Sequence, residues 1–186
     1  MPTSISPMKK SKPFTIATED LAPKKLILGL DPGIARLGFA CLCEDNGQLS
    51  IQDAGVFITT PQAIELRLKL IYEFLQELSQ KYAFTCVAME KVFFSKNVKT
   101  ALSIEAVRGV LMLFGAMQNL QVFQYTPLEV KKTLTMYGQA SKHEVQLVAE
   151  GILGHSLPAS DDACDAVAVA LCYHLSDGGP EYASRN

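Results

Sequence analysis

A short apolar run from Leu26 to Leu30 leads directly into Asp31, and Pro32-Gly33 then turns the chain. An uninterrupted apolar run of this length is typical of a central strand that is buried on both faces of a sheet. In α/β proteins the chemical groups gather at the carboxyl ends of such strands. We therefore expect Asp31 to end a central strand. There it either carries out chemistry or begins a turn, since turns also favour aspartate.

The remaining periodicities predict an α/β protein with a five-stranded mixed sheet flanked by helices. The first three strands run consecutively, and Asp45-Asn46-Gly47 is a hairpin turn, so the first pairs are antiparallel. The fourth strand, like the first, is apolar and ends in an acid, Glu90. Strands are predicted over about residues 25–31, 38–44, 49–57, 85–90 and 121–125, and helices over about 60–82, 99–119, 127–136, 141–153 and 160–175.

The length of 186 residues and the 48% hydrophobic content favour one folded domain, which we place at residues 25–176. Residues 1–24 are rich in Ser, Thr, Pro and Lys and are expected to be a disordered extension, and residues 177–186 a flexible tail. No apolar run is long enough to span a membrane, and the N-terminus lacks the apolar core of a signal peptide.

The net charge of −2 and the pI of about 5.9 argue against a protein that coats nucleic acid indiscriminately. The five cysteines include no C-x-x-C pair, which weakens any zinc or redox interpretation. Reduced thiols are the simpler expectation, and they favour a cytoplasmic location.

A third group of acids opens the last predicted helix, in the stretch Ser160-Asp161-Asp162-Ala163-Cys164-Asp165. Asp165 shares a helix face with Asp162, three residues before it, and with Asp161, four residues before it, so spacing alone does not choose between them. Acids at a helix N-terminus are also stabilised by the helix dipole, which offers a purely structural explanation for the first two.

Carboxylates gathered at one sheet edge raise one another's pKa, and a divalent cation removes that penalty. An oxygen-only ligand set without nearby His or Cys is typical of Mg²⁺, with Mn²⁺ as a substitute. Two such ions about 4 Å apart can activate water and stabilise the leaving oxygen of a phosphodiester. The sequence therefore suggests metal-dependent chemistry on a nucleic-acid phosphate.

Several stretches together resemble the RuvC family of bacterial Holliday-junction resolvases. The resemblance covers about residues 25–175, in order and with similar spacing, and lacks only the family's usual basic C-terminal tail. It implies a ribonuclease-H-like fold and a homodimer that resolves four-way junctions in recombination and repair. Paired, metal-dependent nicks would leave 5′-phosphate and 3′-hydroxyl ends. The stretches are ILGLDPGIARLGFA, AMEKVFFSKN, AVRGVL, EVKKTLTMYGQASKHEVQ and DDACDAVAVALCYH.

By its motifs, the resemblance also implies roles for single residues. The D-A-x-D-A motif selects Asp162 over Asp161, the E-x-V-F motif places Phe93 against junction bases, and the lysines of the remaining motifs lie near the scissile phosphate. The family's partner would be the RuvA–RuvB branch-migration complex. The implied catalytic and metal-binding acids, holding two Mg²⁺ per subunit, are Asp31, Glu90, Asp162 and Asp165, and the implied DNA-binding residues are Phe93, Lys131 and Lys142.

Other functions remain compatible with parts of this pattern. A related nuclease of the same fold, acting on RNA ends or another DNA structure, would share the acids but lack the aromatic loop and the basic V-K-x-T helix. A junction-binding scaffold that has lost cleavage would not need all four acids. An actin-like or sugar-kinase ATPase would need a longer chain and a second phosphate loop, and neither is present.

Overall fold

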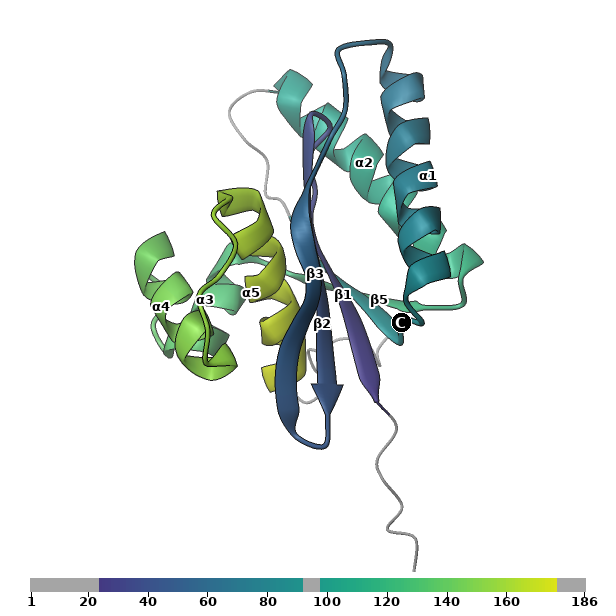
Figure 1. The fold of residues 1–186 in the computed structure, drawn as a ribbon. Helices are drawn as coiled ribbons and strands as arrows, with labels where there is room; N and C mark the ends of the chain where they lie inside the picture. Colours follow the sequence, from purple (N-terminus) through teal and green to yellow (C-terminus); the bar gives the residue numbers. More distant parts are fainter. Residues whose placement is uncertain (1–23, 92–97, 177–186) are drawn as a thin grey trace, which may run out of the picture.

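The computed structural model describes residues 24–91 and 98–176, with the side chains of 98–100 left out. Five strands form one mixed sheet in the order β3-β2-β1-β4-β5 (Figure 1). β1 pairs with β2 and β2 with β3 antiparallel, while β1 with β4 and β4 with β5 are parallel. The carboxyl ends of the three parallel strands β1, β4 and β5 therefore meet at one edge of the sheet.

The elements follow the predicted order, and most of their bounds agree with the predictions to within two residues. The α/β prediction with a five-stranded mixed sheet is confirmed. The strands are β1 Lys25–Asp31, β2 Arg36–Asp45, β3 Gln48–Ile58, β4 Cys86–Glu90 and β5 Gln121–Tyr125, and the helices are α1 Ile64–Lys81, α2 Val98–Met117, α3 Pro127–Thr135, α4 Lys142–Leu153 and α5 Asp161–Leu175.

Helices cover both faces of the sheet, with α1 and α2 on one face and α3, α4 and α5 on the other (Figure 1). Alternation along β1 separates two cores, because Leu26, Leu28 and Leu30 pack with α1 and α2. Ile27 belongs to the second core, which includes the apolar side of α5. The central strand is thus buried on both faces, as its unbroken apolar run predicted.

The closest packing in the fold joins α5 to the sheet through glycines. A Cβ at Gly29 would lie 2.2 Å from the carbonyl oxygen of Ala166, and a Cβ at Gly38 would lie 2.1 Å from that of Asp162. Any side chain at these positions would push the helix away from the sheet. The two glycines, one on β1 and one on β2, therefore set how near the first turn of α5 comes to the end of β1.

The predicted start of α1 was wrong. α1 begins at Ile64 rather than near Thr60, because the backbone of Thr59 donates to the carbonyl of Ala35 and its hydroxyl to that of Ile34. These bonds hold the chain before α1 as a loop. α3 ends at Thr135, close to the predicted bound, and the next residue, Met136, caps it in a left-handed conformation.

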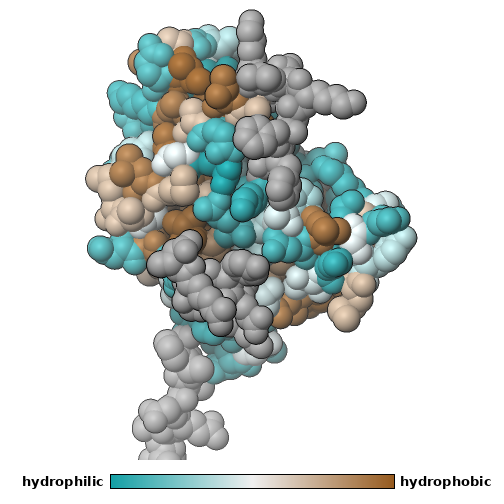
Figure 2. Space-filling view, turned by 180° about the vertical axis from the view of Figure 1, so that it is seen from behind, coloured by the Kyte–Doolittle hydropathy of each residue, from teal (hydrophilic) through white to brown (hydrophobic). Residues whose placement is uncertain are grey.

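Helix α2 carries apolar side chains on its outer side as well as on its core side. Val107, Leu111 and Phe114 are buried against the sheet. Four others remain exposed, and hydrophobic residues gather over this side of the molecule (Figure 2). The exposed side chains are Leu102, Met112, Leu113 and Met117.

All five cysteines are free and buried, as the expectation of reduced thiols required. In the segments the structure describes, no helix is both long enough and apolar enough to cross a lipid bilayer. The predicted extension at residues 1–23 and tail at 177–186 lie outside the described residues.

Candidate active site

Strand alternation aims Asp31 and Glu90 at the same face of the sheet. On β1, Ile27, Gly29 and Asp31 share the side that faces α5, and on β4 the same side carries Glu90. The two strands are parallel neighbours, so their final residues lie next to each other at the sheet edge. The predicted meeting of these two acids follows from the strand register.

The first two turns of α5 bring two further acids to this edge. Asp162 lies where the helix backbone touches Gly38, which is itself the β2 partner of Asp31. Asp162 and Asp165 both raise the pKa of Asp31. Asp161 is exposed, lines the neighbouring cavity and raises the pKa of Lys142.

Asp31 is the most strongly perturbed acid of this cluster. Burial raises its pKa from 3.8 to about 7, and the charges of Glu90, Asp165 and Asp162 reinforce the shift in that order. Burial likewise raises the pKa of Glu90, with Asp165 adding to the effect. Groups perturbed by both desolvation and like charge are typical of functional sites. The negative charges of these carboxylates repel one another, so gathering them at one place does not by itself stabilise the fold.

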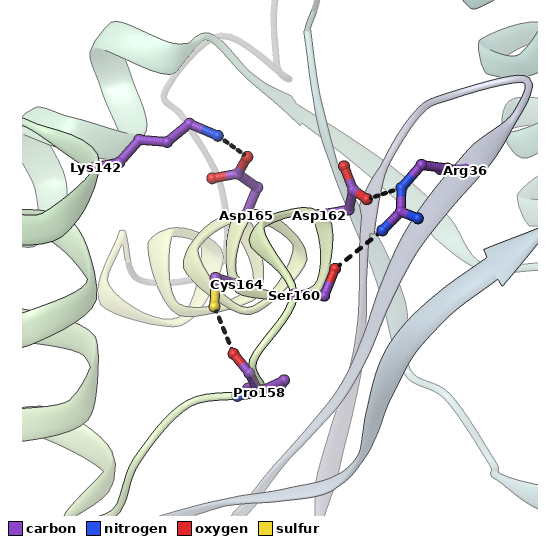
Figure 3. A network of polar contacts seen from close by, with 7 residues as sticks. All are labelled: Arg36, Lys142, Pro158, Ser160, Asp162, Cys164 and Asp165. Carbon is purple, nitrogen blue, oxygen red and sulfur yellow. Dashed lines mark hydrogen bonds and ion pairs between the residues drawn. The ribbon is translucent and has the colours of Figure 1, made fainter.

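Two cations partly offset the negative charge, one beside Asp165 and one beside Asp162. The Nζ atom of Lys142 donates to Asp165 Oδ2 at 2.7 Å, and this bond raises the pKa of Lys142 (Figure 3). Lys142 also lowers the pKa of Asp31 and of Glu90. It stands at the start of α4, where Ser141 and Glu144 form a capping box. The start of the helix thus places this predicted basic residue beside the acids.

The second cation, Arg36, was not predicted. Its Nε atom donates to Asp162 Oδ2 at 2.6 Å, and its guanidinium also reaches Ser160 Oγ at 3.3 Å (Figure 3). Arg36 opens β2, directly after the turn that follows Asp31. The sequence offered one indication: Arg36 is a basic residue at the start of the strand that pairs antiparallel with β1, which places it near the end of β1.

Lys131 lies at the same site, on the side formed by α3. A cavity of about 180 Å³ is lined by Lys131 and Lys142, together with Glu90 and Asp165. Its inner wall is apolar and comes from α3, α4 and α5. Both predicted lysines thus lie within one concave surface with two of the acids. Phe93, the predicted aromatic contact to junction bases, lies outside the described residues.

The donor chemistry of this cluster fits a hard divalent cation, since every candidate ligand is a carboxylate oxygen. Within residues 24–91 and 98–176, no three His, Cys, Asp or Glu side chains stand close enough together to hold a metal ion as they are placed. Asp162 and Asp165 are turned toward Arg36 and Lys142 instead. A divalent cation would therefore replace Arg36 and Lys142 as the partner of these carboxylate oxygens.

Comparison with known proteins identifies the family of this chain. Residues 27–173 match the family model described as "Crossover junction endodeoxyribonuclease RuvC". The chain belongs to the RuvC family. A RuvC from Natranaerobius thermophilus is 41% identical over 150 residues, which are 80% of this chain and 93% of that protein. The match confirms the resemblance seen in the motifs around the four acids.

Solved RuvC structures share the fold. Thermus thermophilus RuvC superposes with a TM-score of 0.76 at 28% identity, covering 82% of this chain and 95% of that one. The same protein in complex with a Holliday junction substrate gives a TM-score of 0.74 at 25% identity, covering 82% and 94%. The ribonuclease-H-like fold expected from the RuvC resemblance is thereby confirmed.

The raised pKa of Asp31 makes a prediction about the metal-free protein. The folded chain binds this proton more tightly than the unfolded chain, so the free energy of unfolding falls as the pH rises from about 4 to about 7. Asp31→Asn removes the titration. We expect the variant to be more stable than the native chain by about 1 to 3 kcal/mol at about pH 8, and equally stable near pH 4.

Urea unfolding in EDTA at the two pH values measures this difference. Asp45→Asn, which removes an exposed carboxylate at the far end of β2, is the matched control and should gain no stability at either pH. A variant at position 31 that is less stable than the native chain at about pH 8 would show that the carboxylate is stabilised in the fold.

Proposed function

We propose that this RuvC-family chain resolves Holliday junctions, using Asp31, Glu90, Asp162 and Asp165 as its catalytic and metal-binding acids. The chain is a crossover junction endodeoxyribonuclease by family. The observation that carries the assignment of residues is the convergence of four carboxylates from β1, β4 and α5 at one sheet edge, with Asp31 desolvated and opposed by the other three. Such a cluster lowers the stability of the fold unless a bound cation offsets the repulsion between the carboxylates.

The four acids would hold divalent cations, and we propose two Mg²⁺ ions per subunit, for which Mn²⁺ can substitute. Bound there, such ions supply an activated water and stabilise the leaving oxygen of a phosphodiester. The chain's own groups prepare the site. Asp31 and Glu90 are held by the sheet, which keeps them from moving apart, and α5 fixes the spacing of Asp162 and Asp165.

The two lysines provide positive charge on the substrate side. Lys142 already lies 2.7 Å from a carboxylate oxygen of the cluster, so exchange of that partner for a phosphate oxygen needs only a short side-chain movement. Lys131 faces the same cavity from α3. We propose that both contact the DNA backbone beside the scissile phosphate, and that Phe93 contacts bases at the junction centre.

Paired cleavage requires two sites, and we propose that α2 supplies the homodimer interface. Its exposed Leu102, Met112, Leu113 and Met117 form an apolar outer side of the kind that a second subunit covers (Figure 2). A two-fold dimer matches the near two-fold symmetry of a four-way junction. We also propose that the RuvA–RuvB complex is the partner that brings junctions to this enzyme.

Cleavage of a mobile four-way junction tests the proposal. The full chain is incubated with end-labelled junction in Mg²⁺ or in EDTA, with linear duplex, single-stranded DNA and RNA as parallel substrates. We expect symmetric nicks with 5′-phosphate ends on the junction alone, and none in EDTA.

Each rival function predicts a different gel. Equal cleavage of linear DNA or RNA would favour a related nuclease of the same fold. Tight junction binding without nicks in Mg²⁺ or Mn²⁺ would favour a scaffold. Nicks that appear on one strand only would contradict the paired action of a dimer.

A further inference from the structure

The turn between α3 and α4 exposes large apolar side chains where the fold does not need them. Met136 is 89% exposed, more than any other large hydrophobic residue in the described part of the chain. The next residue in the chain, Tyr137, is 56% exposed. Leu128, about two helical turns before Met136 on α3, is 52% exposed. Neither Met136 nor Tyr137 belongs to a hydrophobic core of the molecule.

Met136 also has an unfavourable backbone conformation. Its φ of 60° is left-handed, where a side chain with a Cβ costs about 1 to 2 kcal/mol and glycine costs nothing. The residue caps α3, since its backbone N–H donates to the carbonyl of Lys132 at 2.9 Å. Glycine would cap the helix equally well. The methionine side chain therefore makes the folded chain less stable, and within the described residues it joins neither hydrophobic core.

Hydrogen bonds hold this turn in one shape. The hydroxyl of Thr135 lies 2.8 Å from the carbonyl oxygen of Lys131 and 2.9 Å from that of Tyr137, and it accepts the backbone N–H of Tyr137 at 3.2 Å. The backbone N–H of Ala140 closes the turn on the same Tyr137 carbonyl at 3.2 Å. Met136 and Tyr137 are thus presented outward on a fixed support.

The charges around this turn indicate what it faces. Lys131 lines the cavity shared with Glu90 and Asp165, and Lys132 lies beside it on the exposed side, with its stem against Gly138. The turn then continues into Lys142, which pairs with Asp165. Glu129, the acid of α3, is engaged in the capping box with Thr126. Apolar side chains flanked by lysines, on a surface continuous with the acid cluster, suit nucleic acid better than an apolar protein surface.

We propose that Met136 and Tyr137 contact nucleobases of the junction DNA, next to the phosphates that Lys131 and Lys132 neutralise. An aromatic ring and a polarisable thioether both pack well against base faces, and contacts of this kind contribute about 1 to 3 kcal/mol per base. This inference rests on the proposed function, because it needs junction DNA at the acid cluster. It explains why an exposed methionine occupies a position that suits glycine.

Met136→Gly separates a binding role from a structural one, because stability and affinity should change in opposite directions. We expect the melting temperature to rise by about 2 to 4 °C and the affinity for a four-way junction to fall about tenfold. Tyr137→Ser should weaken binding to a similar degree. The full chain is used in EDTA, so that the junction is bound but stays intact. Affinity is measured by fluorescence anisotropy over a range of salt concentrations.

The control is Asn119→Gly, which changes another left-handed residue (φ of 57°) in the turn after α2. Asparagine tolerates this conformation better than methionine does, so the melting temperature should rise less than in Met136→Gly, and affinity should be unchanged. The salt dependence gives a second check. Met136→Gly should keep the slope of log affinity against log salt, while Lys132→Ala should reduce it by about 0.9, the value of one phosphate contact.

Unchanged junction affinity in Met136→Gly and Tyr137→Ser would overturn the inference. The exposed side chains of these two residues would then be better explained by contact with a protein partner. Equal loss of affinity in Asn119→Gly would also overturn it, since general backbone loosening would then explain the result. No junction binding by the native chain would refute the proposed function itself, and the inferred contact with it.

Discussion

Asp31→Asn should lower junction cleavage by at least about 10³-fold while leaving junction binding intact, which corresponds to about 4 kcal/mol in the activation barrier. The reason lies in the geometry of the cluster. Burial and the charges of the other three acids all raise the pKa of Asp31. Asparagine keeps the shape of the side chain but removes the negative charge that a divalent cation needs. Single-turnover cleavage of a labelled junction at saturating enzyme measures the chemical step separately from binding.

A matched pair of variants on α5 distinguishes the chemistry from general charge effects. Asp162→Asn should lose cleavage to a similar degree, because Asp162 lies beside Asp31 across Gly38. Asp161→Asn removes the same charge one residue earlier, from an exposed position, and should cleave within about threefold of the native chain. Strong loss in the Asp161 variant with retention in the Asp162 variant would show that the ligand set is assigned one residue out of place.

Stability and activity are expected to conflict at Asp31. The same substitution that removes cleavage should stabilise the metal-free fold at neutral pH and above, because the carboxylate is desolvated and opposed by like charges. A desolvated carboxylate that lowers the stability of the fold is typical of a functional site. A gain in stability together with a loss of cleavage would therefore be stronger evidence for a catalytic role than either result alone.

Much of the sheet and its two acids could be predicted, because a buried strand is recognised from a few consecutive residues in the sequence. The apolar run before Asp31 is long enough for a strand and too short for most helices, and the run before Glu90 has the same form. Period-two alternation then places Gly29 and Asp31 on one face and Leu28 and Leu30 on the other. Once the two strands are parallel neighbours, their final acids must meet.

The parts that could not be predicted depend on contacts between distant segments. Asp161 and Asp162 both fit the helical spacing to Asp165, so spacing could not choose between them, and the preference for Asp162 came from the family motif alone. Arg36 is the first residue of β2, and its bond to Asp162, which is 126 residues away, depends on how α5 packs against the sheet. The start of α1 was predicted too early because Thr59 is held by the Ile34–Ala35 backbone, a contact that helix propensity does not include.

Lys142→Met should lower junction cleavage about 10²-fold, with a smaller loss of binding. Methionine keeps the length and packing of the side chain and removes only the ammonium group. Loss of one preorganised charge beside a reacting centre typically costs about 10² to 10³ in rate. The control is Lys69→Met, which breaks a comparable exposed ion pair with Glu73 on α1, on the other face of the sheet. That variant should cleave like the native chain, since an exposed pair contributes about 0 to 1 kcal/mol.

The pH dependence of the Lys142 variant tells whether the lysine acts on the acids or only on the DNA. Lys142 lowers the pKa of both Asp31 and Glu90, so without it the two carboxyls keep their protons to higher pH. Carboxylates must be ionised to hold a cation, and the rising limb of cleavage against pH should therefore move upward in Lys142→Met and stay in place in Lys69→Met. A lower rate with an unmoved limb would mean that Lys142 contacts phosphate alone. A native rate would mean that its bond to Asp165 is a surface ion pair without a catalytic role.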